Sequence, residues 1–234
     1  MSKAFDTRKL VLLGLLTAIV VVLQLLGAFI KFGPFSISLV LLPIAIGAAL
    51  ISPLAGGWLG LVFGGVVLAS GDAALFLAVD PLGTVLVVLL KGMLAGLAAG
   101  AVYRLLDRIL KSGIKKTISA VAAAVVCPIV NTGIFLIGSY IFFMPTLRVW
   151  AAGAEAEAAG FSDATEWVVS QGFATVSEWA ASSDGSAIVV TFIFIGLVGL
   201  NFLVEMGLNI LLSPTIVRLI QYGQDKRGII NPGG

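Results

Sequence analysis

The sequence predicts an all-α integral membrane protein, a bundle of six transmembrane helices with both termini in the cytoplasm. Of its 234 residues, 59% are apolar and only 11% are charged, whereas roughly a quarter of the residues in a soluble domain are charged. Long windows contain no charge at all, and a membrane-spanning helix needs about 20 apolar residues. Most of the basic residues fall in three clusters, at residues 3–9, 104–116 and 218–227.

These basic clusters decide the number of spans. Basic residues next to transmembrane helices stay in the cytoplasm, so an even number of crossings separates each cluster from the next. The 40-residue uncharged window 32–71 must then hold two spans, and Pro53 supplies a turn between them. The whole chain, 1–234, is expected to form a single transmembrane domain. Its expected spans are 10–30, 36–51, 53–70, 82–106, 117–147 and 187–220.

Composition also excludes several kinds of site. The chain has no histidine and a single cysteine, Cys127, so histidine-based catalytic pairs and the common metal sites are not expected. A net charge of +2 does not favour a nucleic-acid partner. No GxxxxGK[ST] phosphate-binding loop occurs. We therefore expect neither an enzyme nor a bound cofactor or metal.

The loop 148–186 is the one long segment expected outside the membrane, on the outer side. Ser162 to Glu166 and Thr175 to Glu178 have the pattern of helix starts with a capping acid. Trp150, Trp167 and Trp179 also lie here. One interpretation is short helices at the membrane surface with tryptophans among the headgroups. The other is a lid over an external pocket.

Glycines recur every four residues in two of the predicted spans. They are Gly56, Gly60 and Gly64 in the third span, and Gly92, Gly96 and Gly100 in the fourth. Glycines spaced in this way lie on one face of a helix and let two backbones approach closely in lipid. We expect most of them to pack inside the bundle.

Two charged residues fall inside predicted spans, where a charge at the helix centre costs about 2.5–3.5 kcal/mol. Lys91 and Glu205 each stand 13 residues before a cytoplasmic arginine, Arg104 and Arg218. At 1.5 Å per residue, both lie about 20 Å from the inner boundary. The two charges are therefore expected in the same layer of the membrane.

Four amide side chains accompany this layer. Gln24 and Asn131 stand 15 residues beyond Lys9 and Lys116, which gives nearly the same depth. Asn201 and Asn209 flank Glu205 at intervals of four residues and form a polar stripe with it. Two interpretations remain open: a pocket for a polar solute, or a buried Lys91–Glu205 ion pair that only fixes the helix arrangement. The candidate binding residues are Gln24, Lys91, Asn131, Asn201, Glu205 and Asn209.

Four stretches of the chain resemble a known family. They are 37–64, 89–106, 127–138 and 201–220, and they are similar to the substrate-binding S components of energy-coupling factor (ECF) transporters. The resemblance implies a high-affinity binding subunit of an ATP-driven importer of vitamin-type micronutrients, located in the bacterial plasma membrane. Its partners would be a membrane coupling subunit, two cytoplasmic ATPases and the surrounding lipid. It does not identify the vitamin.

The resemblance also implies roles for particular segments. Small residues four apart on the first span dock on the coupling subunit in this family, and Gly14 and Ala18 occupy that spacing here. The segments 29–38 and 71–83 become candidate gates. An alternative function is a self-sufficient, proton-coupled secondary carrier that uses Glu205 as its proton site. A membrane scaffold or an unrecognised enzyme is a third hypothesis.

Overall fold

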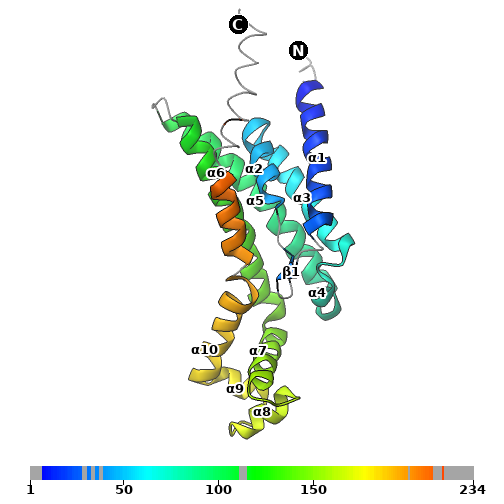
Figure 1. The fold of residues 1–234 in the computed structure, drawn as a ribbon, viewed down its shortest axis with the longest axis vertical. Helices are drawn as coiled ribbons and strands as arrows, with labels where there is room; N and C mark the ends of the chain where they lie inside the picture. The colour runs from blue at the N-terminus through cyan, green and yellow to red at the C-terminus, as the bar shows by residue number, and fades with distance from the viewer. Residues whose placement is uncertain are drawn as a thin grey trace, which may run out of the picture.

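The computed structural model is a long helical bundle (Figure 1) in which residues 7–27, 31–32, 35–36, 39–110, 115–199, 201–212 and 218 are described. Helices α1, α2, α3, α5 and α6 form one end, and α7 to α10 form the other. A short antiparallel pair, β1 with β2, connects α1 to α2. The helices are α1 Thr7–Gly27, α2 Leu41–Leu50, α3 Pro53–Ser70, α4 Ala74–Val79, α5 Pro81–Ile109, α6 Lys115–Gly138, α7 Met144–Ala158, α8 Ala164–Ser170, α9 Val176–Ala181, α10 Ser183–Thr191 and Asn201–Leu212; the π-helices are η1 Ser139–Phe143 and η2 Phe192–Leu197; the strands are β1 Lys31–Phe32 and β2 Phe35–Ser36.

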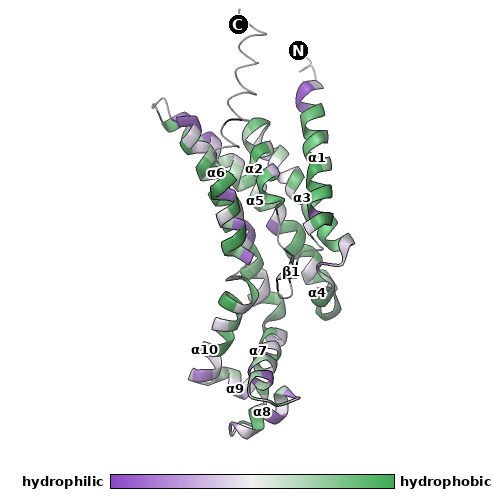
Figure 2. Ribbon diagram, in the orientation of Figure 1, coloured by the Kyte–Doolittle hydropathy of each residue, from purple (hydrophilic) through white to green (hydrophobic). Residues whose placement is uncertain are grey.

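The described residues contain four helices long and apolar enough to cross a membrane. They are Thr7–Gly27, Pro53–Ser70, Pro81–Ile109 and Lys115–Ala158. A bent pair, Ser183–Leu197 with Asn201–Leu212, counts as a fifth when taken as one span. The chain is therefore a multi-pass membrane protein, and Figure 2 shows how apolar residues dominate these long helices.

Two of the predicted spans differ from the structure. Within the predicted span 36–51 the structure has α2, of only 10 residues, about 15 Å, and β2 lies at the start of the span. The span 187–220 is interrupted at η2 and bends by 40° before Asn201–Leu212. Parts of these predictions lie outside the described residues: the span ends at 28–30, 213–217 and 219–220, both termini, and most of the candidate gate 29–38.

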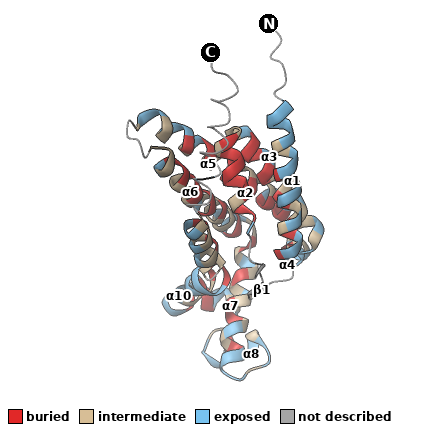
Figure 3. Cartoon of the chain, turned by 45° about the horizontal axis from the view of Figure 1, so that its top comes forward, coloured by how far each residue is buried: buried red, intermediate tan, exposed pale blue. Residues whose placement is uncertain are grey.

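Close contact between α3 and α5 forms the centre of the bundle, where buried residues concentrate (Figure 3). Each of the six repeated glycines faces a backbone group of the other helix: a Cβ at Gly60 would collide with the carbonyl of Gly92, and one at Gly96 with the carbonyl of Gly56. This confirms the predicted packing role of the repeated glycines. Because this contact fixes α5 against α3, it also fixes the position along the bundle of Lys91, the residue next to Gly92.

Caps explain where several helices begin. The Ser52 hydroxyl accepts a hydrogen bond from Ala55 N at 3.0 Å, and Pro53 follows it as the first helical residue of α3. Asp80 caps α5 in the same way: its carboxylate accepts a hydrogen bond from Gly83 N at 3.0 Å. The α3 helix ends at Gly71, whose φ of 83° suits glycine.

Residues 144–191, which we call the helical extension, pack around a second core that also includes Phe76 of α4 and Val87 of α5. The helix Lys115–Ala158 has 44 residues, about 66 Å, and so exceeds the roughly 30 Å hydrocarbon core of a bilayer. Within the predicted loop 148–186 the structure has the end of α7, then α8, α9 and the start of α10. Asp163 and Thr175 cap α8 and α9, which confirms the two predicted helix starts.

Two tryptophans of the helical extension lie in its core. Trp167 and Trp179 are 7% and 2% exposed, and their rings meet edge to face at 5.3 Å. The interpretation that places these two rings among lipid headgroups is therefore wrong. Trp150 instead contacts Phe76 of α4, with 5.5 Å between ring centroids, and this contact joins the extension to the bundle.

Candidate substrate-binding cavity

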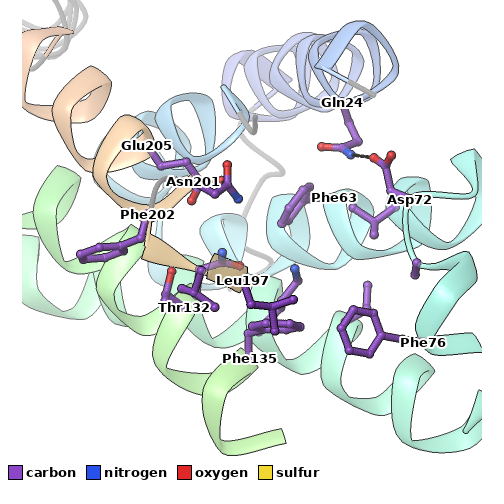
Figure 4. A pocket seen from close by; sticks show the side chains of 16 residues that line it. Gln24, Phe63, Asp72, Phe76, Thr132, Phe135, Leu197, Asn201, Phe202 and Glu205 are labelled. Atoms are coloured by element: carbon purple, nitrogen blue, oxygen red, sulfur yellow. Dashed lines mark hydrogen bonds between the residues drawn. The ribbon is translucent and has the colours of Figure 1, made fainter. Parts of the chain in front are cut away.

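A cavity lies where the bundle meets the base of the helical extension (Figure 4). Its volume is about 80 Å³, room for several water molecules. The walls come from α1, α3, α4, α5, α6, η2 and the helix Asn201–Leu212. The residues that line it are Gln24, Phe63, Val67, Asp72, Ala73, Phe76, Val88, Lys91, Asn131, Thr132, Phe135, Leu197, Val198, Asn201, Phe202 and Glu205.

Five of the six predicted binding residues meet in this cavity. Gln24, Lys91, Asn131, Asn201 and Glu205 come from four different helices. Depth counting along the chain predicts one layer for four of them, and Asn201 joins them through its four-residue spacing from Glu205. The sixth, Asn209, is 3% exposed but does not line the cavity. It lies one helical turn below Glu205, so the polar stripe continues past the cavity floor.

Lys91 extends from α5 against two aromatic rings. Its Nζ lies 5.3 Å from the centroid of Phe135 and 5.7 Å from that of Phe63, both cation–π distances. The one salt bridge among the described residues joins Lys115 to Asp107 and not Lys91 to Glu205. The structure thus shows Lys91 on aromatic faces of a cavity wall, not in a direct ion pair with Glu205.

Gln24 connects α1 to the turn after α3. Its Nε2 donates a 2.7 Å hydrogen bond to Asp72 Oδ2, drawn as a dashed line in Figure 4. Gln24 is 2% exposed and Asp72 is half-buried, so this bond is partly shielded from water. It anchors Asp72, which the charge pattern had placed in an outer loop, at the rim of the cavity.

On the opposite wall, Asn201 Nδ2 lies 3.5 Å from Glu205 Oε1, at the outer limit of a hydrogen bond. The two residues are four apart, so they project from one face of their helix, as Figure 4 shows. Thr132 lies next to Asn131 on α6 and also lines the cavity. The polar groups therefore face one another across the cavity from α1, α5, α6 and Asn201–Leu212.

The sequence analysis missed the aromatic part of the site. Phe63, Phe76, Phe135 and Phe202 contribute rings to the wall, and Phe76 packs on Phe135 with 5.7 Å between centroids. One signal was available: Phe135 follows Asn131 by four residues and so shares its helix face. Phe63 and Phe76 reach the cavity because of how α3 and α4 are oriented toward α5. The spacing of residues in the sequence does not give that orientation.

Gly14 and Ala18 lie far from the cavity on an exposed face of α1. Both are exposed, and a Cβ added at Gly14 would meet no atom within 4 Å among the described residues. Large apolar neighbours on the same helix, Val11 and Leu15, are 66% and 59% exposed. This part of α1 is thus covered by lipid or by another protein.

One comparison with known proteins identifies a family. Residues 8–217 match the family model described as ECF transporter, substrate-specific component. No match to a curated protein or to a solved structure was found. The family match covers the whole bundle, every residue of the cavity and the helical extension. The chain therefore belongs to the substrate-specific components of ECF transporters, the membrane subunits that bind the solute to be transported.

Proposed function

We propose that this chain captures a small micronutrient-type solute outside a bacterial cell with high affinity and holds it in the cavity described above. A membrane coupling subunit and two cytoplasmic ATPases then drive its release to the cytoplasm. One observation carries the proposal: five polar side chains from four helices converge on one cavity in an otherwise apolar bundle. Burying so many polar groups in a membrane protein is costly, and a polar solute would provide partners for them.

Within the cavity we assign substrate contact to Gln24, Lys91, Asn131, Asn201 and Glu205. Lys91 and Glu205 supply charge, and the amides supply directional hydrogen bonds. We assign Asn209 to the support of Glu205 from below. The aromatic side chains around these groups give a planar solute an apolar contact surface.

We also propose six crossings with both termini in the cytoplasm. The second crossing would combine α2 with the β1–β2 hairpin before it, since α2 alone spans about 15 Å. Eight of its ten residues are buried, which agrees with a position inside the bundle. A cysteine at Gln171 should then react with an impermeant thiol reagent on intact cells, and one at Arg108 only after lysis. The reverse labelling pattern would contradict this topology.

The function is tested by identifying the solute and then measuring its transport. Mass spectrometry of the small molecules that copurify with the chain names the candidate solute. Reconstitution should give uptake of that solute only when the coupling subunit and both ATPases are present with ATP. Uptake by the chain alone, driven by a proton gradient, would contradict the proposal and favour a self-sufficient carrier.

A further inference from the structure

The cavity walls hold hydrogen-bond acceptors that no described group satisfies. The side-chain oxygens of Gln24, Asn131 and Asn201 are buried and have no hydrogen-bond partner in the structure. The other buried atoms of this kind, on Asp107, Ser119 and Ser139, belong to residues that do not line the cavity. A buried acceptor without a donor is costly, so a cluster of three around one space indicates that the occupant brings donors.

The remaining described polar lining residues hold carboxylates on Asp72 and Glu205 and donor-bearing groups on Lys91 and Thr132. An ionised carboxylate only accepts hydrogen bonds, whereas the Lys91 ammonium only donates and the Thr132 hydroxyl does both. Gln24 Nε2 is already engaged with Asp72, and Asn201 Nδ2 is directed toward Glu205. Lys91 is the one cationic side chain among the described lining residues.

The aromatic side chains give the cavity an apolar contact surface. The Lys91 ammonium already lies over the rings of Phe63 and Phe135, at 5.7 and 5.3 Å from their centroids. Two further rings, Phe76 and Phe202, line the cavity. Flat ring faces favour an aromatic occupant that stacks on them or meets them edge to face.

We propose that the solute is an aromatic or heteroaromatic compound that carries N–H donors, such as an amino or amidinium group, and is neutral or positively charged. Its donors bind the oxygens of Gln24, Asn131 and Asn201, and its ring contacts the phenylalanines. An organic acid is disfavoured, because its carboxylate would face two carboxylates and only one ammonium and would supply no donor to the three amide oxygens. This inference rests on the proposed function and specifies the solute of that same cavity.

Three probes of nearly equal shape test the inference: benzamidine, benzamide and benzoate. Their affinities for the purified full chain in lipid nanodiscs can be compared by isothermal titration calorimetry. We expect benzamidine to bind at least tenfold more tightly than benzoate, with benzamide between them. Equal or tighter binding of benzoate, or binding of none of the three, would overturn the inference.

A matched pair of variants locates the contact. Asn131→Leu removes the acceptor while keeping the number and branching of side-chain heavy atoms, and Asn131→Asp retains the acceptor. The first should weaken benzamidine binding at least tenfold and the second should not, and unchanged binding in both overturns the assignment. Asn201→Leu, at a half-buried position, provides the same measurement if Asn131→Leu does not fold.

The outcome is separable from that of the proposed function. A carboxylic acid that copurifies and is transported with ATP would overturn the inference and leave the transporter subunit intact. Preference for benzamidine together with proton-driven uptake by the chain alone would support the inference and contradict the transporter-subunit function. The two proposals therefore fail in different measurements.

Discussion

Gly60 and Gly92 face each other across the contact between α3 and α5, and a Cβ on either would collide with the backbone carbonyl of the other. In a membrane there is little hydrophobic force to hold helices together, so such close packing contributes directly to stability. The same contact sets the position of Lys91, the neighbour of Gly92 in the chain, on the cavity wall. Packing at these two glycines and the geometry of the cavity are therefore linked.

Replacing Gly60 with alanine should destabilise the bundle by about 1–3 kcal/mol, the usual cost of overpacking a core. The added methyl group forces α3 away from α5, because the atoms that it meets are backbone and cannot turn aside. Thermal unfolding in detergent measures the effect. Gly65→Ala on the same helix is the control, since a Cβ there has no atom within 4 Å. Equal melting temperatures for the two variants would contradict the packing argument.

Lys91 and Glu205 should contribute to solute binding and not only to folding. Glu205→Gln and Lys91→Met remove the charges at similar size, and each should weaken binding of the copurifying solute at least tenfold, about 1.4 kcal/mol. The reason is that both residues line the cavity without a direct ion pair between them. Calorimetry gives the affinities, and melting curves verify the fold. Full affinity combined with a lower melting temperature would identify the two charges as structural.

Depth along a helix was predictable from the sequence, because the rise of 1.5 Å per residue is fixed. This is why Gln24, Lys91, Asn131 and Glu205 could be placed in one layer before any coordinates. Rotation and bending were not predictable in the same way. Asp72 follows a glycine turn, and its hydrogen bond to Gln24 depends on how that turn folds back over α1.

The limits of the predicted spans have a related explanation. Charges mark where a helix leaves the lipid, but they do not end it, so α6 continues through η1 into α7 past Arg148. Alanine and glutamate in residues 151–158 are strong helix formers in water. Burial of Trp167 against Trp179 could not be foreseen either, because it requires α8 and α9 to pack together.

The start of α8 should depend on pH in the acidic range. The Asp163 carboxylate accepts hydrogen bonds from the backbone N–H groups of Glu166 and Thr165, which lower its pKa below the usual 3.8. A lowered pKa stabilises the folded helix above about pH 3.8, and this stabilisation is lost as the pH falls through the lower, folded value. Hydrogen exchange of the Thr165 and Glu166 amides, corrected for intrinsic rates, should show less protection at low pH.

Two variants isolate this cap. Asp163→Ala should reduce protection of the same amides already at pH 7, because alanine supplies no acceptor. Asp163→Asn should keep much of the protection and lose its dependence on pH, because the amide oxygen accepts hydrogen bonds but does not titrate. An identical pH dependence in Asp163→Asn and the unmodified chain would show that another group is responsible.

Substitutions at Gly14 and Ala18 should abolish docking on the coupling subunit without affecting solute binding. These small residues lie on the exposed face of α1, whereas Gln24, two to three turns further along, lines the cavity. Replacing both with leucine holds a partner helix away and removes close backbone packing. Affinity of the purified variant for the copurifying solute should stay within twofold of the unmodified chain. Uptake by cells that supply the coupling subunit and the ATPases should be lost.

The control for this variant uses the same helix at a site of similar exposure. Val22, 53% exposed, lies beyond Ala18 toward the cavity end of α1, and Val22→Leu adds only one methylene without blocking a small-residue face. It should retain both binding and uptake. Normal uptake by the Gly14→Leu, Ala18→Leu variant would remove the docking role from these two residues. Loss of solute affinity in that variant would show instead that α1 transmits changes at its exposed face to Gln24 and the cavity.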